Sequence, residues 1–85
     1  MSNEKFTKGE WVSSYANVEC GNLLIADCEQ EGVDAFECNA NANLIAAAPE
    51  MYAMLKKIHD SMAGISEYGY FYYDVKDMLA KARGE

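Results

Sequence analysis

The chain has 85 residues, of which 51% are hydrophobic, and its 14 acidic side chains against 7 basic ones give a net charge of −7. This surplus of negative charge repels nucleic-acid phosphates and anionic lipids, so direct binding to DNA, RNA or a membrane surface is not expected. The chain is long enough for one small domain, and its longest apolar stretch is far shorter than the roughly 20 residues of a membrane span, so residues 1–85 are expected to form a single acidic domain.

The N-terminal residues do not predict a secretory signal. Residues 1–11, MSNEKFTKGEW, lack the apolar centre of a secretory signal, which predicts a cytoplasmic protein. In a reducing compartment the three cysteines remain thiols, and none of them forms a CxxC pair. The single histidine, His59, lies far along the chain from all of them, so no zinc site is expected. The cysteines are Cys20, Cys28 and Cys38.

Residues 10–29 are predicted to form an antiparallel hairpin. The turn is placed at Gly21 and Asn22, because this pair accepts the positive φ angles of a tight two-residue turn. Counting outward from the turn gives the expected register, which pairs Cys20 with Leu23, Val18 with Ile25 and Ala16 with Asp27. The face predicted to be buried then contains Val12, Ala16, Val18, Cys20, Leu23 and Ile25.

The following segment, EQEGVDAFECN, begins as an acidic turn around Gly32. Residues 33–37 either form a short third strand or lead directly into the next helix, and the sequence leaves both open. A two-stranded hairpin is marginal by itself, so a third strand or a helical cover is required. The predicted fold class is α+β, with an antiparallel hairpin or three-stranded sheet packed against two or three helices.

An apolar stripe with steps of three and four residues predicts helical structure from 39 to 62. Pro49 lies within the stripe, and a proline costs about 3 kcal/mol in a helix interior but almost nothing in a first turn. The sequence allows one helix bent at Pro49, or a short helix ending near Ala47 and a second one starting at Pro49. Glu50 favours the second arrangement and the unbroken stripe favours the first. We expect a break or sharp kink that keeps both segments on the same core.

A last helix is predicted at residues 71–83, with its apolar side made of Phe71, Val75, Met78, Leu79 and Ala82. Five aromatic residues lie between positions 68 and 73, which is more than one small core can hold. Tyrosine is favoured at protein interfaces, so Tyr70, Tyr72 and Tyr73 are candidate anchors for a partner. The alternative is that these rings cover the edge of the domain.

No pattern in the chain predicts catalysis. His59 and Asp60 are neighbours on a predicted helix and point about 100° apart, so they do not form an oriented acid–base pair. The sequence contains no nucleophile elbow, no glycine-rich phosphate loop, no HExxH zinc motif and no EF-hand. We expect neither an enzyme nor a cofactor or metal site.

The interval between Lys8 and Lys56 contains eight carboxylates and no lysine or arginine. Such a run is usually a solvated surface that keeps a small protein soluble. It also suits a negative strip that the nucleic-acid groove of another protein accepts in place of phosphates, with fast and salt-sensitive association. The carboxylates that would make this contact are Asp27, Glu29, Glu31, Asp34 and Glu37.

Two segments resemble small proteins encoded by bacteriophages and prophages. Residues 39–55, NANANLIAAAPEMYAML, are similar to the A-N-A-x-L-I-A-A-A-P-E-L segment of those proteins through Asn41 and residues 44–50, and LAKARGE at 79–85 is similar to their usual tail. The resemblance implies phage origin. Small acidic phage proteins include anti-CRISPR proteins, several of which are thought to occlude DNA-binding surfaces of a Cas complex as nucleic-acid mimics.

Size, acidity and phage character together predict an anti-CRISPR-like inhibitor that binds a nucleic-acid-handling protein complex, such as a type I Cas effector, in the cytoplasm of the bacterial host. A monomer is expected, and a dimer is compatible with the sequence. The alternative is a phage structural or assembly accessory that acts through homo-oligomerisation or an aromatic protein interface. The third hypothesis is a small enzyme that depends on the thiol of one of the cysteines.

Overall fold

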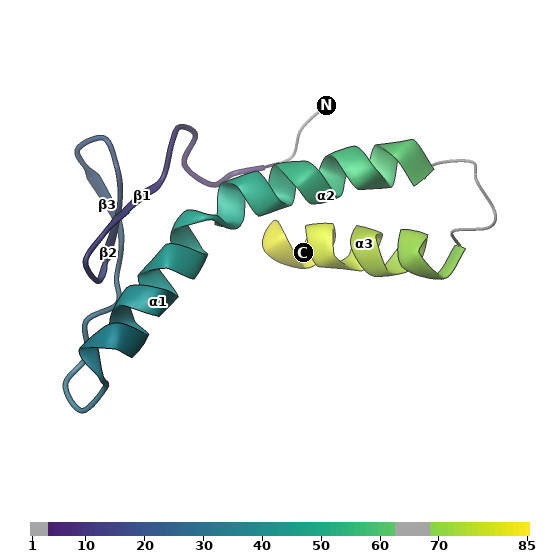
Figure 1. Cartoon of the computed structure of the whole chain (residues 1–85). Helices are drawn as coiled ribbons and strands as arrows, with labels where there is room; N and C mark the ends of the chain where they lie inside the picture. The colour runs from purple at the N-terminus through teal and green to yellow at the C-terminus, as the bar shows by residue number, and fades with distance from the viewer. Residues whose placement is uncertain (1–3, 63–68) are drawn as a thin grey trace. The chain divides into compact units, whose positions relative to one another are not determined.

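The computed structural model describes residues 4–62 and 69–85 (Figure 1). The elements are β1 (Val12–Ser14), β2 (Asn17–Cys20), β3 (Leu23–Asp27), α1 (Ala35–Ala46), α2 (Ala48–Met62) and α3 (Gly69–Ala82). A three-stranded antiparallel sheet with three helices confirms the predicted α+β class.

Two compact units make up the chain, and each is described by itself. Residues 7–49 contain the sheet and α1 and are called the sheet unit. The described part of residues 1–6 and 50–85 contains most of α2 and all of α3 and is called the hairpin unit. The expectation of one domain over residues 1–85 stays a prediction.

The sheet has three strands because the first arm of the predicted hairpin, residues 10–20, turns back on itself at Tyr15 and Ala16. The strand order is β1-β2-β3 with antiparallel neighbours. The backbone of Tyr15 has a φ of 56°. Among the described residues, no other residue except glycine has a positive φ. A positive φ at the first position of a two-residue turn lets the chain reverse within two residues.

The option of a third strand at 33–37 is wrong, because α1 already begins at Ala35. The Asp34 side chain caps this helix, with Oδ1 accepting a hydrogen bond from the Phe36 N–H at 2.7 Å. Glu37 adds an acidic side chain to the first turn. The pattern of Asp34 followed three residues later by Glu37 is a helix-start signal that would have placed the start before residue 39.

The register of β2 and β3 follows the prediction only next to the turn. Cys20 lies opposite Leu23, as expected, and Gly21 has φ +60°. An irregularity between Val18 and Glu19 then shifts the pairing, so that Val18 lies opposite Ala26 and Asn17 lies opposite Asp27. The predicted pairs of Val18 with Ile25 and of Ala16 with Asp27 are therefore wrong. A β-bulge places an extra residue in one strand, and counting from the turn cannot detect it.

Four small side chains form the buried core of the sheet unit: Ala16, Val18, Cys38 and Ala42. Helix α1 covers β1 and β2, and the Ser13 Oγ donates a hydrogen bond to the Asn43 Oδ1 at 2.6 Å. Ser13 and Val18 lie opposite each other, so both face α1.

Two residues of the predicted buried face are exposed. Val12 is 51% exposed and Leu23 is 52% exposed. Val12 lies opposite Glu19, which is next to the buried Val18 in β2, so Val12 and Val18 point to opposite faces of the sheet. The turn at Tyr15 and Ala16 causes this reversal. Leu23 follows the second turn, at the end of the sheet.

The predicted break near Pro49 is confirmed. Helix α1 ends at Ala46, α2 begins at Ala48, and the Ala47 N–H donates to the carbonyls of Asn43 and Leu44, both at 3.2 Å. Pro49 is the second residue of α2, where a missing N–H removes no helix hydrogen bond. The boundary between the two units follows Pro49, and a core shared by both helical segments stays a prediction.

Helices α2 and α3 form an antiparallel helical hairpin (Figure 1). Near the end of α2, the His59 ring stacks on Tyr72 from the start of α3, with centroids 4.6 Å apart. At the other end, the Arg83 Nη1 donates a hydrogen bond to the Tyr52 hydroxyl at 3.2 Å. Within the described part of the hairpin unit, the buried apolar side chains are those of Tyr52 and Leu79.

Residues at both chain ends pack onto the hairpin. The Phe6 ring meets Tyr52 edge-on with centroids 5.3 Å apart, and the Glu4 Oε1 lies 3.6 Å from the Lys56 Nζ. The Arg83 Nε donates to the Glu85 Oε2 at 2.9 Å. Hydrogen bonds to Glu85 and then to Tyr52 raise the pKa of Arg83, and the hydrogen bond from Arg83 lowers the pKa of Glu85.

Candidate functional site

Most of the net negative charge of the protein lies in the sheet unit. Residues 7–49 contain seven carboxylates and one lysine, Lys8, which gives a net charge of −6. The remaining residues contain seven carboxylates and six basic side chains, a net charge of −1. The two units therefore differ strongly in electrostatic character although they are joined by one continuous chain.

The five predicted contact carboxylates lie along the connection from β3 to α1, which we call the acidic connection (residues 27–37). Asp27 ends β3, Glu29 and Glu31 lie between the elements, Asp34 caps α1, and Glu37 is in its first turn. All five are exposed. Within the described chain, none of the five lies within ion-pair distance of a lysine or arginine.

Three of these carboxylates have a local structural role. The Asp27 Oδ1 accepts a hydrogen bond from the Glu29 N–H at 3.1 Å, and Asp34 caps α1 as described above. Glu37 complements the positive end of the α1 dipole. Among the described residues, no hydrogen bond to the side chains of Glu29 and Glu31 is present, so these two carboxylates are the ones without a structural explanation.

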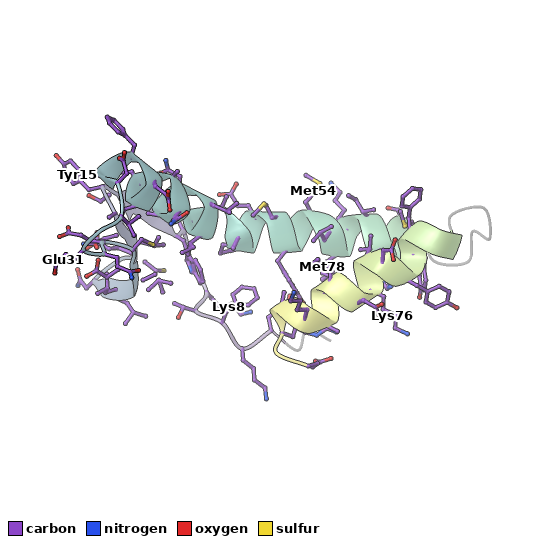
Figure 2. The ribbon with its side chains drawn as sticks, turned by 90° about the horizontal axis from the view of Figure 1, so that it is seen from below. Lys8, Tyr15, Glu31, Met54, Lys76 and Met78 are labelled. Carbon is purple, nitrogen blue, oxygen red and sulfur yellow. The ribbon has the colours of Figure 1, made fainter. Side chains whose placement is uncertain are left out.

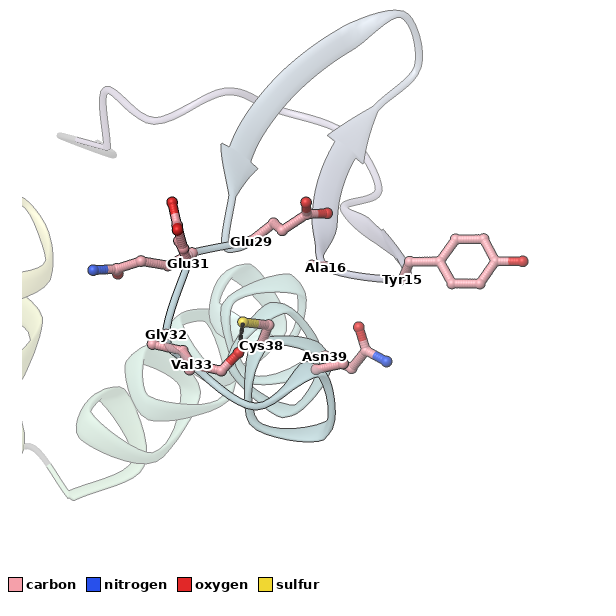
Figure 3. A pocket seen from close by; sticks show the side chains of 10 residues that line it. Tyr15, Ala16, Glu29, Glu31, Gly32, Val33, Cys38 and Asn39 are labelled. Atoms are coloured by element: carbon pink, nitrogen blue, oxygen red, sulfur yellow. Dashed lines mark hydrogen bonds between the residues drawn. The ribbon is translucent and has the colours of Figure 1, made fainter.

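An open groove of about 650 Å³ lies beside Glu29 and Glu31 (Figure 3). It runs between the β1–β2 turn and the start of α1, and its lining includes Ala16, Val33 and Asn39. Figure 3 shows Cys38 at its base, with the thiol 3.9 Å from the Val33 carbonyl oxygen. A groove with an apolar base and carboxylates at its side suits a long cationic side chain, which has an apolar stem and a charged end.

Tyr15 stands next to this groove and was missed as a candidate by the sequence reasoning. Its side chain is 89% exposed, and Figure 3 shows the ring pointing away from the groove. Figure 2 shows Tyr15 and Glu31 at the same end of the molecule's sheet unit. The available signal was weak: Ser14 and Asn17, two residue types that favour turns, flank the Tyr15-Ala16 pair.

The predicted aromatic anchors belong to the hairpin unit, not to the acidic connection. Tyr72 is half-buried, stacks on His59 and meets Tyr73 edge-on with centroids 5.3 Å apart, so its ring takes part in hairpin packing. Tyr73 is 62% exposed. The side chain of Tyr70 lies outside the described part of the structure.

His59 and Asp60 were considered above as an acid–base pair. The His59 Nδ1 is 3.6 Å from the Asp60 Oδ1, beyond hydrogen-bond distance.

The cysteines are free thiols, with Cys20 and Cys28 half-buried and Cys38 buried. In residues 4–62 and 69–85, no three His, Cys, Asp or Glu side chains are grouped so that they could hold a metal ion. Across the same described residues, no helix has the length and apolar character needed to cross a membrane.

Comparison with known proteins places the whole chain in one family. Residues 1–85 match the family model described as Salmonella phage P22 protein Y8K6. No curated protein and no solved structure matches the chain. The matched range covers the acidic connection, the groove beside it and both helices of the hairpin.

Proposed function

Since the chain belongs to the family of the Salmonella phage P22 protein Y8K6 and is a small phage protein, we propose that it acts by binding a cationic surface of a host protein through its acidic sheet unit. The observation that carries this proposal is the net charge of −6 within residues 7–49, with the carboxylates of the acidic connection exposed. A surface of this kind attracts basic proteins and repels nucleic acid.

The kind of partner follows from the same charge. Proteins that bind nucleic acid present grooves lined with lysine and arginine, and a row of carboxylates can occupy such a groove in place of phosphates. We propose a stoichiometric inhibitor of a host nucleic-acid-handling complex, with a type I Cas effector as the candidate target. Phage origin, small size and acidity support this anti-CRISPR-like role.

The contribution of the carboxylates is expected mainly in the rate of association. A single exposed ion pair contributes about 0.2–1 kcal/mol, whereas several charges of one sign together steer the encounter of two proteins. Glu29 and Glu31 are the best positions for a test, because no local hydrogen bond depends on their side chains. Asp34 is unsuitable, since its loss would remove the cap of α1.

The test compares two charge-reversal variants with the same change in net charge. Glu29→Lys/Glu31→Lys alters the acidic connection, and Asp60→Lys/Asp77→Lys alters exposed carboxylates of the hairpin unit. The target is captured from host lysate and purified, and association rates are then measured at several ionic strengths. The first variant should associate at least about tenfold more slowly at low salt, and the second should remain close to the unaltered protein. Equal rates for both folded variants would remove the acidic connection as the binding surface.

A further inference from the structure

The hairpin unit exposes large apolar side chains, and their positions follow the same rule on both helices. Four of them are between 38% and 64% exposed, and each directly precedes a residue that is buried or contacts the other helix. The pairs are Met51 before Tyr52, Ile58 before His59, Phe71 before Tyr72, and Met78 before Leu79.

These four side chains lie on one face of the hairpin. Moving back one residue rotates a side chain by about 100° around the helix axis. Because α2 and α3 run antiparallel, the same sense of rotation on both helices leads to the same side of the plane that contains them. We call this side the apolar hairpin face; Met54, 58% exposed, lies at its edge. Figure 2 shows Met54 on α2 and Met78 on α3.

The opposite face of the hairpin is mostly polar, with Tyr73, which follows the inward Tyr72, as an exposed aromatic side chain. This face also carries other contacts. Residues that follow the inward positions, such as Asp60 and Ala53, point to that side. Glu4 and Phe6 pack at Lys56 and Tyr52, at the plane of the hairpin or on its polar side. The hairpin is thus amphipathic across its plane.

The exposed apolar area is large enough for an interface. The five side chains expose together on the order of 500 Å² per copy, given that a large side chain has roughly 150–250 Å² of surface. A standard interface buries about 800 Å² per partner, and about 65% of a homodimer interface is apolar. The apolar hairpin face therefore supplies about the apolar share that a homodimer needs, and its polar margin can supply the rest.

The charges at the outer edges of the hairpin favour a second copy as the occupant. Each helix carries an acidic side chain and, seven residues later, a basic one: Glu50 and Lys57 on α2, and Asp74 and Lys81 on α3. All four are exposed. When two such hairpins stack face to face with antiparallel helices, the acidic positions of one copy lie at the same level along the helix axes as the basic positions of the other.

Helix length and net charge agree with this choice. Helices α2 and α3 have 15 and 14 residues, so two hairpins match from end to end. The hairpin unit has a net charge of −1, which allows two copies to approach, whereas two sheet units at −6 repel each other. We propose that the apolar hairpin face binds the same face of a second copy, so that two hairpins form a four-helix bundle.

This proposal differs from the monomer expected from the sequence and does not depend on the target of the acidic connection. The first test is the mass of the intact chain in solution by sedimentation equilibrium at up to about 100 µM. A dimer of about 19 kDa is expected, twice the 9.4 kDa of one chain, and it should persist at high salt because the contact is apolar. A mass of 9.4 kDa throughout this range would overturn the proposal, including the case in which residues 7–49 or another protein cover the face.

The second test uses neighbouring positions on opposite faces. Met54→Glu and Met78→Glu place a charge on the apolar hairpin face, and Ala53→Glu places the same charge on the polar side of α2. The methionine variants should raise the dimer dissociation constant at least about tenfold, while Ala53→Glu should leave it unchanged. Circular dichroism checks that each variant keeps its helices, and neutral Met54→Gln and Met78→Gln replace any that do not. Equal weakening by Ala53→Glu, or none by the methionine variants, would place the contact elsewhere.

Discussion

Replacing the same residue type in two neighbouring strands gives the sharpest test of the fold. Val18 is fully buried, with 0% exposure, whereas Val12 on β1 is 51% exposed and faces the other side of the sheet. Val18→Ala removes two methyl groups, which corresponds to about 1.6 kcal/mol of transfer free energy, and the remaining cavity adds about 1 kcal/mol. Val12→Ala leaves no cavity and should cost less than about 1 kcal/mol.

The measurement is urea denaturation followed by the fluorescence of Trp11, the single tryptophan of the chain. Trp11 lies in the sheet unit, and its indole N–H donates to the Thr7 carbonyl oxygen at 3.1 Å, so it reports on the unit that contains both valines. The midpoint of Val18→Ala should fall below that of Val12→Ala by about 1–2 M urea. Equal losses would mean that both valines face one core, as in a continuous first strand, and would refute the turn at Tyr15.

Three further predictions concern local geometry. Tyr15→Asn should raise the free energy of unfolding by about 0.5–1 kcal/mol, because asparagine tolerates a positive φ better than tyrosine. A Tyr15→Ala control should show no such gain. A loss of stability in the asparagine variant would contradict the turn geometry. Asp34→Ala should lower the free energy of unfolding by about 1 kcal/mol in thermal denaturation, because the Phe36 N–H loses its acceptor, whereas Asp34→Asn should retain most of the cap. The hydrogen bond from Arg83 lowers the pKa of Glu85 below its ordinary value of 4.5. The stabilisation by this hydrogen bond is therefore complete above pH 4.5 and is lost as the pH falls through the folded-state pKa. The melting temperature of Glu85→Gln should be lower than that of the unaltered protein at neutral pH and should converge with it in acid, and a difference independent of pH would exclude this carboxylate as its source.

Features that depend on a few neighbouring residues were predictable from the sequence. The turn at Gly21 and Asn22, the start of α2 around Pro49 and the last helix all follow from local backbone preferences. The α+β class also follows, since strand-like and helix-like periods occupy separate parts of the chain. Phage origin was readable from Asn41 and residues 44–50, and the match of residues 1–85 to a phage protein family agrees with it.

The candidate site was only partly predictable. That Glu29 and Glu31 are exposed follows from their charge, because an unpaired carboxylate is rarely buried. Their position beside a groove depends on where the β1–β2 turn approaches the start of α1, which no local pattern encodes. Tyr15 illustrates the same limit, since its exposure and positive φ arise from a turn that lacks the usual glycine.

The sequence by itself determined the α+β class, the turn at Gly21 and Asn22, the break near Pro49, the last helix and the anionic middle of the chain, because these properties are set by each residue and its near neighbours. Tertiary structure alone decided which face each side chain occupies. A two-residue turn reversed the facing of Val12 relative to Val18, and a bulge shifted the pairing of β2 with β3. The docking of α2 on α3 selected Tyr52 and Leu79 as inward residues. An apolar stripe is wider than a single helix contact, so only packing determines which of its side chains, such as Met78, stay exposed.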